Sequence, residues 1–221
     1  GIAHEFNNLL TPIMGYSILI LEKLPPEDTE SYENALEIYN ASQKAKQIIS
    51  RLSNLSRKET PGPLRPIRLD TLAEQVLEVT APARPKGVRV ETGFSGRSRP
   101  ILGDETQLFQ LTLNLVLNSF EALSGQGGTV RVSTGTDGNH AVLRVADNGP
   151  GIPDEVKDLI FDPFFTTKGS GKGIGLGLAI VQQIVEAHGG TITLESAAGQ
   201  GTAFTVAFPA APPEEEGDPQ P

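Results

Sequence analysis

Apolar residues in the first part of the chain recur with the period of an α-helix. Two prolines at positions 25 and 26 interrupt this pattern, and a second helical pattern runs from about Ser31 to Arg57. The sequence therefore predicts a hairpin of two long helices. Because such a hairpin buries little surface, we expect it to dimerise into a four-helix bundle; packing on the rest of the chain is the alternative. The apolar stripe of the first helix consists of Ile2, Phe6, Leu9, Ile13, Ile20 and Leu24.

Helical and alternating patterns interleave in residues 67–209, after a Pro- and Gly-rich segment at 60–66 that is predicted to be a linker. Residues 1–59 form the first predicted domain, and residues 210–221, rich in Pro and Glu, a disordered tail. Several strands form hairpins, which favours an α+β sandwich with a mixed sheet over a doubly wound parallel sheet. The predicted helices cover residues 69–79, 104–123 and 175–188, and the predicted strands cover 88–94, 129–134, 141–146, 191–196 and 202–208.

Composition excludes several classes of function. The 221-residue chain has a net charge of −9, which argues against a nucleic-acid-binding surface. It contains no cysteine and therefore has neither a disulfide framework nor a cysteine metal site. No run of 18 apolar residues is present, so no membrane span is predicted. The sequence starts inside a helical pattern without Met, and we expect it to be a fragment of a longer protein.

A polar cluster near the start of the first predicted helix contains His4, Glu5 and Asn8. His4 lies roughly 170° around the helix from the apolar stripe, so it is predicted to face solvent or a partner. Imidazole is a competent nucleophile near neutral pH, and a neighbouring carboxylate can hold the N–H of its other nitrogen. Taken alone, this cluster is weak evidence for catalysis, because a single exposed histidine on a helix is usually only solvated.

Two asparagines stand on one face of an otherwise apolar predicted helix, at positions 114 and 118. Buried amides are costly unless they find polar partners. Amide oxygens can join a Mg²⁺ shell made mainly of phosphate and water oxygens. The alternative is a pair of core amides that bond to backbone.

Two glycine-rich stretches follow. Asp147 ends a predicted strand and begins the segment DNGPGIP, where a carboxylate could accept from an adenine amino group, although a simple turn is the alternative. Residues 169–177 contain five glycines and lead into a helix, an arrangement that suits phosphate binding and is not a Walker-type loop. The alternative is a flexible linker, but this segment lies between Phe164-Phe165 and an apolar helix.

Together these motifs resemble the sensor histidine kinases of two-component signalling over residues 1 to about 209. The matching segments are HEFNN at 4–8, NLVLN at 114–118, DNGPGIP at 147–153, FDPFFTTK at 161–168, GKGIGLGLAIV at 171–181 and GTAFTVAFP at 201–209. Their order and spacing are specific, whereas no single segment would be. The first segment departs from the commonest form of the family and is similar to the nitrogen-regulatory and hybrid-type subset.

The resemblance implies a Bergerat-type ATP-binding fold and a set of site residues. His4 would be the phosphoacceptor, Glu5 would assist it, and Asn8 would orient water for a phosphatase reaction on the partner regulator. Asn118 and Asn114 would bind Mg²⁺ and phosphate, and Asp147 would bind the adenine amino group. The implied nucleotide site comprises Asn114, Asn118, Asp147, Gly149, Gly151, Phe165, Thr166, Lys168, Gly173, Gly175, Gly177 and Leu178.

The resemblance also implies an activity and partners. The protein would phosphorylate its own histidine from ATP and pass the phosphoryl group to an aspartate of a response regulator. It would act as a cytoplasmic homodimer without direct membrane contact in this fragment, although the parent protein could be membrane-anchored. An ATPase of the same superfold is one alternative, but those enzymes carry a glutamate where this chain has Asn114. A degenerate kinase that only binds nucleotide and dimerises is the other.

Overall fold

The computed structural model describes residues 2–25, 28–56, 64–94, 96, 98–167 and 175–211, with backbone alone for residues 2–8, 43–44 and 46–56. The chain divides into two compact units, residues 1–60 and 61–221.

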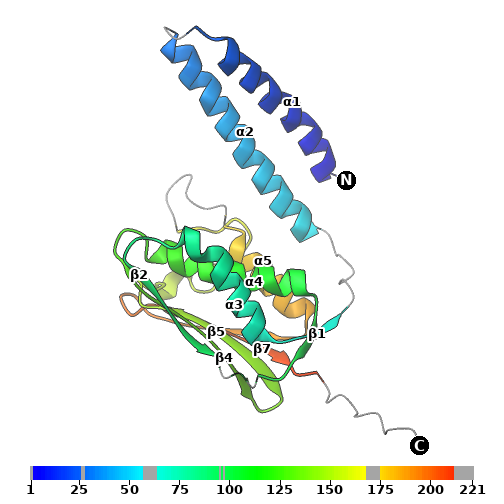
Figure 1. The fold of residues 1–221 in the computed structure, drawn as a ribbon, viewed down its shortest axis with the longest axis vertical. Coiled ribbons are helices and arrows are strands. Elements are labelled where there is room, and N and C mark those ends of the chain that lie inside the picture. The colour runs from blue at the N-terminus through cyan, green and yellow to red at the C-terminus, as the bar shows by residue number, and fades with distance from the viewer. Residues whose placement is uncertain are drawn as a thin grey trace, which may run out of the picture. The chain divides into compact units, whose positions relative to one another are not determined.

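The first unit is a pair of helices packed side by side, α1 (Ile2–Lys23) and α2 (Thr29–Ser56) (Figure 1). The side chain of Asp28 accepts from the Ser31 N–H over 3.1 Å and so caps the start of α2. Small buried residues, Ser17, Ala35 and Ser42, occupy the described part of the hairpin interior. This confirms the predicted helical hairpin. None of the described helices is long and apolar enough to cross a lipid bilayer.

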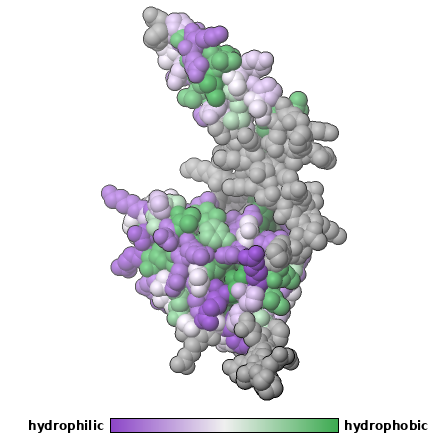
Figure 2. All heavy atoms as spheres, turned by 45° about the vertical axis from the view of Figure 1, so that its right-hand side comes forward, coloured by the Kyte–Doolittle hydropathy of each residue, from purple (hydrophilic) through white to green (hydrophobic). Residues whose placement is uncertain are grey.

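Large apolar side chains of this hairpin remain exposed in the single chain, as the green surface in Figure 2 shows. Leu9 is 62% and Tyr16 is 68% exposed. Exposed apolar surface of this extent marks an interaction face. The exposed residues are Leu9, Ile13, Tyr16, Ile18, Leu19, Ile20, Tyr32, Leu36 and Ile38.

The second unit contains a five-stranded sheet in the order β2-β4-β5-β7-β6. Only the β2–β4 pair is parallel; the other neighbours are antiparallel, so the sheet is mixed. A separate two-stranded sheet pairs β1 with β3. The strands are β1 (Arg65–Ile67), β2 (Val88–Phe94), β3 (Ile101–Gly103), β4 (Gly128–Asp137), β5 (His140–Asp147), β6 (Thr191–Ser196) and β7 (Thr202–Pro209).

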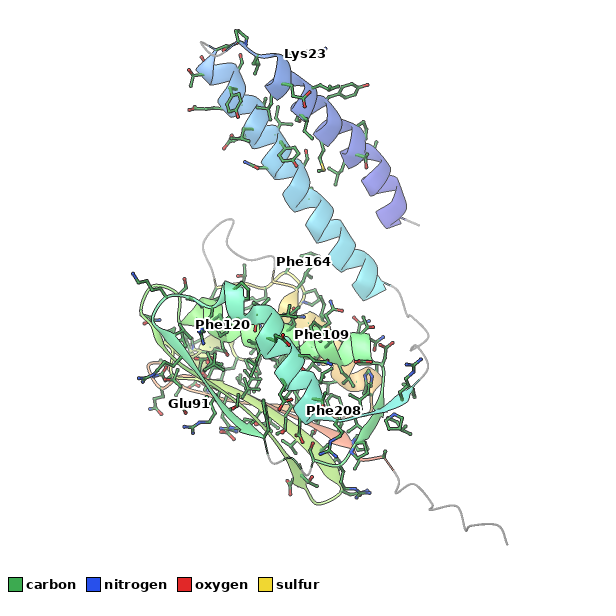
Figure 3. The ribbon with its side chains drawn as sticks, viewed as in Figure 1. Lys23, Glu91, Phe109, Phe120, Phe164 and Phe208 are labelled. Carbon is green, nitrogen blue, oxygen red and sulfur yellow. The ribbon has the colours of Figure 1, made fainter. Side chains whose placement is uncertain are left out.

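Three helices cover one face of the large sheet, with α4 packed between α3 and α5 (Figure 1). Phe120 on α4 and Phe208 on β7 are buried between the two layers (Figure 3). The predicted α+β sandwich is therefore confirmed. The helices are α3 (Leu69–Thr80), α4 (Glu105–Ala122) and α5 (Gly177–Ala187), and two short 3₁₀ turns cover Ala81–Ala83 and Asp154–Val156.

A histidine holds the C-terminal end of α5 against the start of α4. The Asp104 side chain caps α4 by accepting from the N–H groups of Thr106 and Gln107. The Asp104 N–H donates to His188 Nε2 over 3.0 Å, and His188 Nδ1 lies 2.8 Å from the Ile184 carbonyl oxygen. Since Nε2 accepts, Nδ1 must be the protonated nitrogen. This link fixes α5 alongside α4.

A buried carboxylate joins α3 to the sheet. Asp70 accepts from the hydroxyls of Thr134 and Ser98 and from the Arg68 guanidinium. Burial acts to raise the pKa of Asp70, but the hydrogen bonds from Thr134, Ser98 and Arg68 outweigh it, so the pKa lies below its ordinary value.

Three predictions of secondary structure need correction. Strand β1 begins at Arg65 and includes Pro66, within the predicted linker, and its partner β3 was not predicted. Three-residue strands are too short to show a period, and an edge strand tolerates proline. Helix α5 begins at Gly177, two residues later than predicted.

The predicted disordered tail begins too early. The Ala210 N–H donates to the Asn139 carbonyl over 2.9 Å, and the Ala211 N–H donates to the Pro100 carbonyl over 2.7 Å. Ala211 is also buried. Backbone hydrogen bonds hold these two alanines, and composition does not reveal such bonds. The rest of the predicted tail and residues 60–63 of the linker lie outside the described residues.

Candidate nucleotide-binding and phosphoacceptor sites

The two asparagines of α4 lie beside the N-terminal end of α5. Asn114 Nδ2 donates to the Gly177 carbonyl oxygen over 3.4 Å. A Cβ atom on Gly177 would lie 3.8 Å from both the nitrogen and the oxygen of the Asn118 amide. The first turn of a helix carries unpaired N–H groups and the positive end of the helix dipole, which together attract phosphate. Both amides therefore lie at a helix terminus of the kind that binds phosphate.

Asp147 is the last residue of β5 and is half-buried. Its Oδ1 accepts from the Gly149 N–H over 2.9 Å. Burial raises the pKa of Asp147 above its ordinary value, and the Gly149 N–H and the nearby polar groups of Ser119 and Thr202 only partly oppose the rise. A carboxylate held in this way can accept from a ligand donor, such as the amino group of a purine.

The turn that follows this carboxylate packs directly on the turn between β6 and β7. The Gly199 N–H donates to the Pro150 carbonyl over 2.6 Å, and a Cβ atom on Gly151 would overlap the Ala197 carbonyl oxygen. In this structure, Gly151 therefore allows two turns to approach each other. A Cβ atom on Gly149 would lie 2.8 Å from Oδ1 of the carboxylate, so this glycine leaves space next to the acceptor.

Backbone contacts join the phenylalanine motif to the start of the second glycine motif. The Phe164 N–H donates to the Gly175 carbonyl over 2.9 Å, and a Cβ atom on Gly175 would overlap the Phe165 carbonyl oxygen. Phe164 has a φ of 71°, a value that non-glycine residues rarely adopt, and its side chain is 55% exposed. Figure 3 labels Phe164 on the second unit. These contacts hold the two ends of residues 165–175 together.

The other predicted nucleotide residues are only partly placed. Thr166 is exposed next to Phe165, and Leu178 is half-buried in the first turn of α5. Lys168 and Gly173 lie outside the described residues.

The predicted catalytic residues His4, Glu5 and Asn8 belong to α1, in the first unit. Their backbone is helical, as the apolar pattern predicted, and their side chains lie outside the described part of the structure.

Sequence reasoning missed two residues that affect the Asp147 carboxylate. Ser119 and Thr202 are both buried, and their polar groups act to lower its pKa. Ser119 directly follows the second asparagine of α4, and Thr202 belongs to the closing strand motif. Spacing identified both motifs but not which of their groups would meet this carboxylate.

The chemistry of the donor set fits Mg²⁺ bound together with a nucleotide. In the described ranges, no group of three or more His, Asp or Glu side chains gathers as an independent metal site. Mg²⁺ usually takes few protein ligands and fills its shell with phosphate and water oxygens. The amides of Asn114 and Asn118, beside a helix terminus that suits phosphate, match that requirement.

Comparisons with known proteins divide the chain in the same way. Residues 1–61 match the family model "His Kinase A (phospho-acceptor) domain", and residues 103–212 match "Histidine kinase-, DNA gyrase B-, and HSP90-like ATPase". The sensor histidine kinase ZraS of Escherichia coli (strain K12) is 35% identical over 210 residues, which is 95% of this chain. The match spans 44% of ZraS, so the chain corresponds to less than half the length of that relative.

Solved structures with the same fold include one complex with a nucleotide analogue and one complex with a response regulator. Full-length ShkA in complex with AMPPNP aligns with a TM-score of 0.77 and 27% identity, covering 95% of this chain and 45% of that one. Histidine kinase ThkA in complex with the response regulator TrrA aligns with a TM-score of 0.68 and 28% identity, covering 96% of this chain and 61% of that one.

Proposed function

Because the chain belongs to the sensor histidine kinases of two-component signalling, we propose that it is the core of an ATP-dependent autokinase. It transfers a phosphoryl group from ATP to His4 and then to an aspartate of a response regulator. One observation carries this proposal: the same chain combines a phosphoacceptor hairpin with a unit in which Asp147 and the start of α5 both adjoin α4.

The nucleotide binds with its base at Asp147 and its phosphates at the start of α5. The carboxylate accepts from the adenine 6-amino group, and Gly149 leaves space for the ring. Helix N–H groups and the dipole of α5 stabilise the phosphate charge. Both ends adjoin α4, because a Cβ atom on Gly149 would lie 2.8 Å from the carboxylate and 3.5 Å from Ala122 Cβ, and Asn118 lies beside the first residue of α5.

The amide oxygens of Asn118 and Asn114 would hold Mg²⁺ together with phosphate oxygens. When bound, it neutralises phosphate charge and supports phosphoryl transfer. Asn114 uses Nδ2 to donate to the Gly177 carbonyl, which leaves its Oδ1 as the metal-binding atom. Phe165, Thr166, Lys168, Gly173, Gly175 and Leu178 complete the proposed phosphate side of the site.

His4 is the nucleophile. One imidazole nitrogen forms a bond to the γ-phosphorus while the bond from that phosphorus to the β,γ-bridging oxygen breaks, and ADP leaves. The carboxylate of Glu5 holds the N–H of the other ring nitrogen and so favours the attacking tautomer. The phosphohistidine then donates its phosphoryl group to a receiver aspartate, and Asn8 orients the water that hydrolyses the resulting phosphoaspartate to aspartate and inorganic phosphate.

Two partners follow from this function. A second copy of the chain covers the exposed apolar face of α1 and α2 and completes a four-helix bundle. A response regulator binds in turn, as the complex of ThkA with TrrA illustrates for that kinase. The requirement for ATP places this part of the protein in the cytoplasm.

The test is incubation of the whole chain with Mg²⁺ and γ-³²P-ATP, with His4→Gln and His140→Gln measured alongside. His140 is an exposed histidine at the start of β5 and serves as the matched control. We expect an acid-labile, base-stable label that His4→Gln abolishes and His140→Gln retains. Release of inorganic phosphate without a labelled protein would favour an ATPase, and ADP binding with neither product would favour a degenerate kinase.

A further inference from the structure

The turn that follows the proposed base acceptor, Asp147, is anchored at both of its ends. At its start, the Asn148 N–H donates to the Thr129 carbonyl over 3.3 Å, and the Thr129 N–H donates to Asn148 Oδ1 over 2.7 Å. At its other end, the Ile152 N–H donates to the hydroxyl oxygen of Ser196 over 2.8 Å. The start of the turn is therefore held by β4, and its far end is held by a serine side chain on β6.

Ser196 lies in the same row of the sheet as the acceptor. It is the last residue of β6 and pairs with Thr202 on β7, which in turn pairs with Asp147 on β5. Residues that pair across neighbouring strands point to the same face of a sheet, and two strand spacings separate these two backbones by about 10 Å. Ser196 is therefore too far away to bond the carboxylate itself, and it can influence the acceptor only through the turn.

The hydrogen-bonding capacity of the Ser196 hydroxyl is fully used at this corner of the sheet. A hydroxyl has one proton to donate and two lone pairs that accept. The proton goes to the Gly201 carbonyl oxygen over 2.8 Å. One lone pair accepts from the Ile152 N–H, and the Thr202 hydroxyl, 3.0 Å away, must then donate to the other. A single oxygen atom thus joins the turn after β5 to the start of β7.

Backbone groups supply further contacts to this half of the turn. The Gly199 N–H donates to the Pro150 carbonyl, and the Ala197 carbonyl lies against Gly151. Such backbone contacts do not depend on the side chain at position 196, whereas the bond to Ile152 does. Removal of the Ser196 hydroxyl should therefore loosen one end of the turn while the rest of its packing remains.

We propose that Ser196 is a positioning residue for nucleotide binding: its hydroxyl fixes residues 148–152 as a preformed wall on the base side of the site. This inference rests on the proposed function, because it assigns a further role in the same nucleotide site. A preformed wall reduces the ordering that binding must otherwise impose on the turn. Because the turn adjoins the base and not the phosphates, loss of the hydroxyl should weaken nucleotide binding and leave phosphoryl transfer from bound ATP unchanged.

The experiment measures the initial rate of ³²P labelling of the whole chain against the concentration of Mg²⁺-ATP, for wild type and Ser196→Ala. A contact with the base is the same before and during phosphoryl transfer, so its weakening raises KM and leaves kcat unchanged. We expect KM for ATP to rise about three- to tenfold, the effect of one hydrogen bond, with kcat within about twofold of wild type. The dissociation constant of ADP, from calorimetric titration, should rise by the same factor.

Two further variants test whether the hydroxyl itself is responsible. Thr193→Val removes a hydroxyl from the same strand, where it donates to the Thr205 carbonyl over 3.5 Å, and should keep the wild-type KM and ADP affinity. Ser196→Cys nearly keeps the volume but replaces the hydroxyl with a weak donor and acceptor, so it should raise KM as Ser196→Ala does. Urea unfolding of each variant establishes how much of it is folded under the assay conditions.

A lower kcat with an unchanged KM in Ser196→Ala would overturn the inference, because a smaller fraction of folded protein has that effect. Unchanged KM and ADP affinity in Ser196→Ala, or wild-type values in Ser196→Cys, would overturn it as well. These outcomes leave the proposed function intact, since the wild-type chain is still labelled. If wild type bound ADP without any label, the autokinase proposal would be wrong and the ADP dissociation constants would decide the inference. If wild type bound no ADP, both would be wrong.

Discussion

Replacing Gly201 with alanine should impair nucleotide binding, whereas replacing Gly199 should not, although both lie in the turn between β6 and β7. Both glycines have a left-handed backbone, with φ values of 82° and 76°. A Cβ atom on Gly199 would meet nothing within 4 Å. A Cβ atom on Gly201 would overlap the carbonyl oxygen of Asp147 and lie 2.9 Å from the Asn148 Cα atom. The two variants thus share a backbone penalty, and only the Gly201 variant also overlaps the backbone of Asp147 and Asn148.

The magnitudes follow from these differences. A left-handed alanine costs about 1–2 kcal/mol, so Gly199→Ala should lower the free energy of unfolding by about that amount. Gly201→Ala adds an overpacking penalty of about 1–3 kcal/mol, because one of the two backbones must shift. That shift should displace Asp147, the proposed base acceptor, so ADP binding should weaken by about ten- to one-hundredfold, which corresponds to the loss of one charged hydrogen bond.

The assay is ADP titration of both variants by calorimetry, with urea unfolding of each in parallel. The unfolding data show whether each variant is folded under the conditions of the titration. Equal ADP affinities for the two variants would refute the reasoning, because the turn would then have no influence on the Asp147 carboxylate.

Three other predictions concern two carboxylates, Asp147 and Asp70, and one amide, Asn8. Asp147→Asn should abolish ADP binding yet leave the free protein at least as stable as wild type at pH 7. Burial raises the pKa of this carboxyl. The contribution of this carboxyl to stability is therefore present below about pH 4 and is lost as the pH rises through the folded-state pKa. Urea unfolding at pH 7 and at pH 4 checks this, and a large loss of stability at pH 7 would contradict it. Asp70→Asn should destabilise by about 1–3 kcal/mol at pH 7, because three donors lose a charged acceptor. The pKa of Asp70 is lowered, so the loss of stability in Asp70→Asn should persist above about pH 4 and shrink as the pH falls through the folded-state pKa. A loss of stability that is constant with pH would argue against a charge effect. Asn8→Ala should retain ³²P labelling of His4 but lose phosphatase activity on a phosphorylated receiver domain, and retained phosphatase activity would exclude the proposed role.

Longer elements with a clear period were predictable from the sequence. The strand predicted at 88–94 has those bounds in the structure, and the helix predicted at 104–123 differs only by its two capping residues. Elements that depend on distant partners were not predictable: Ile67 pairs with Ile101, and Ala211 bonds to Pro100. Such contacts join segments far apart in the chain, and three residues carry no measurable period.

The candidate site was likewise only partly predictable from the sequence. Asn118 and Asp147 stand out in the sequence because an amide in an apolar helix and a carboxylate after a strand are costly unless they have a role. Ser119 and Thr202 do not stand out, because a hydroxyl in a helix and a threonine in a strand are ordinary. Their partner is decided by how helix and sheet pack, which motif spacing does not encode. The close approach of the Ala197 carbonyl to Gly151 is likewise not apparent from the motif, because it depends on how two turns pack together.

Helix α4 has a particular position in this site because it is connected at three points along its length. Its first residue follows Asp104, whose N–H binds His188 at the end of α5. Its last two turns carry Asn118, next to the start of α5, and Ala122, next to Gly149 and the Asp147 carboxylate at the end of β5. A helix rises 1.5 Å per residue and does not stretch, so these connections fix the separation between the proposed base acceptor and the proposed phosphate-binding terminus. A nucleotide that fits one end therefore fits the other only if its base and phosphates are the same distance apart.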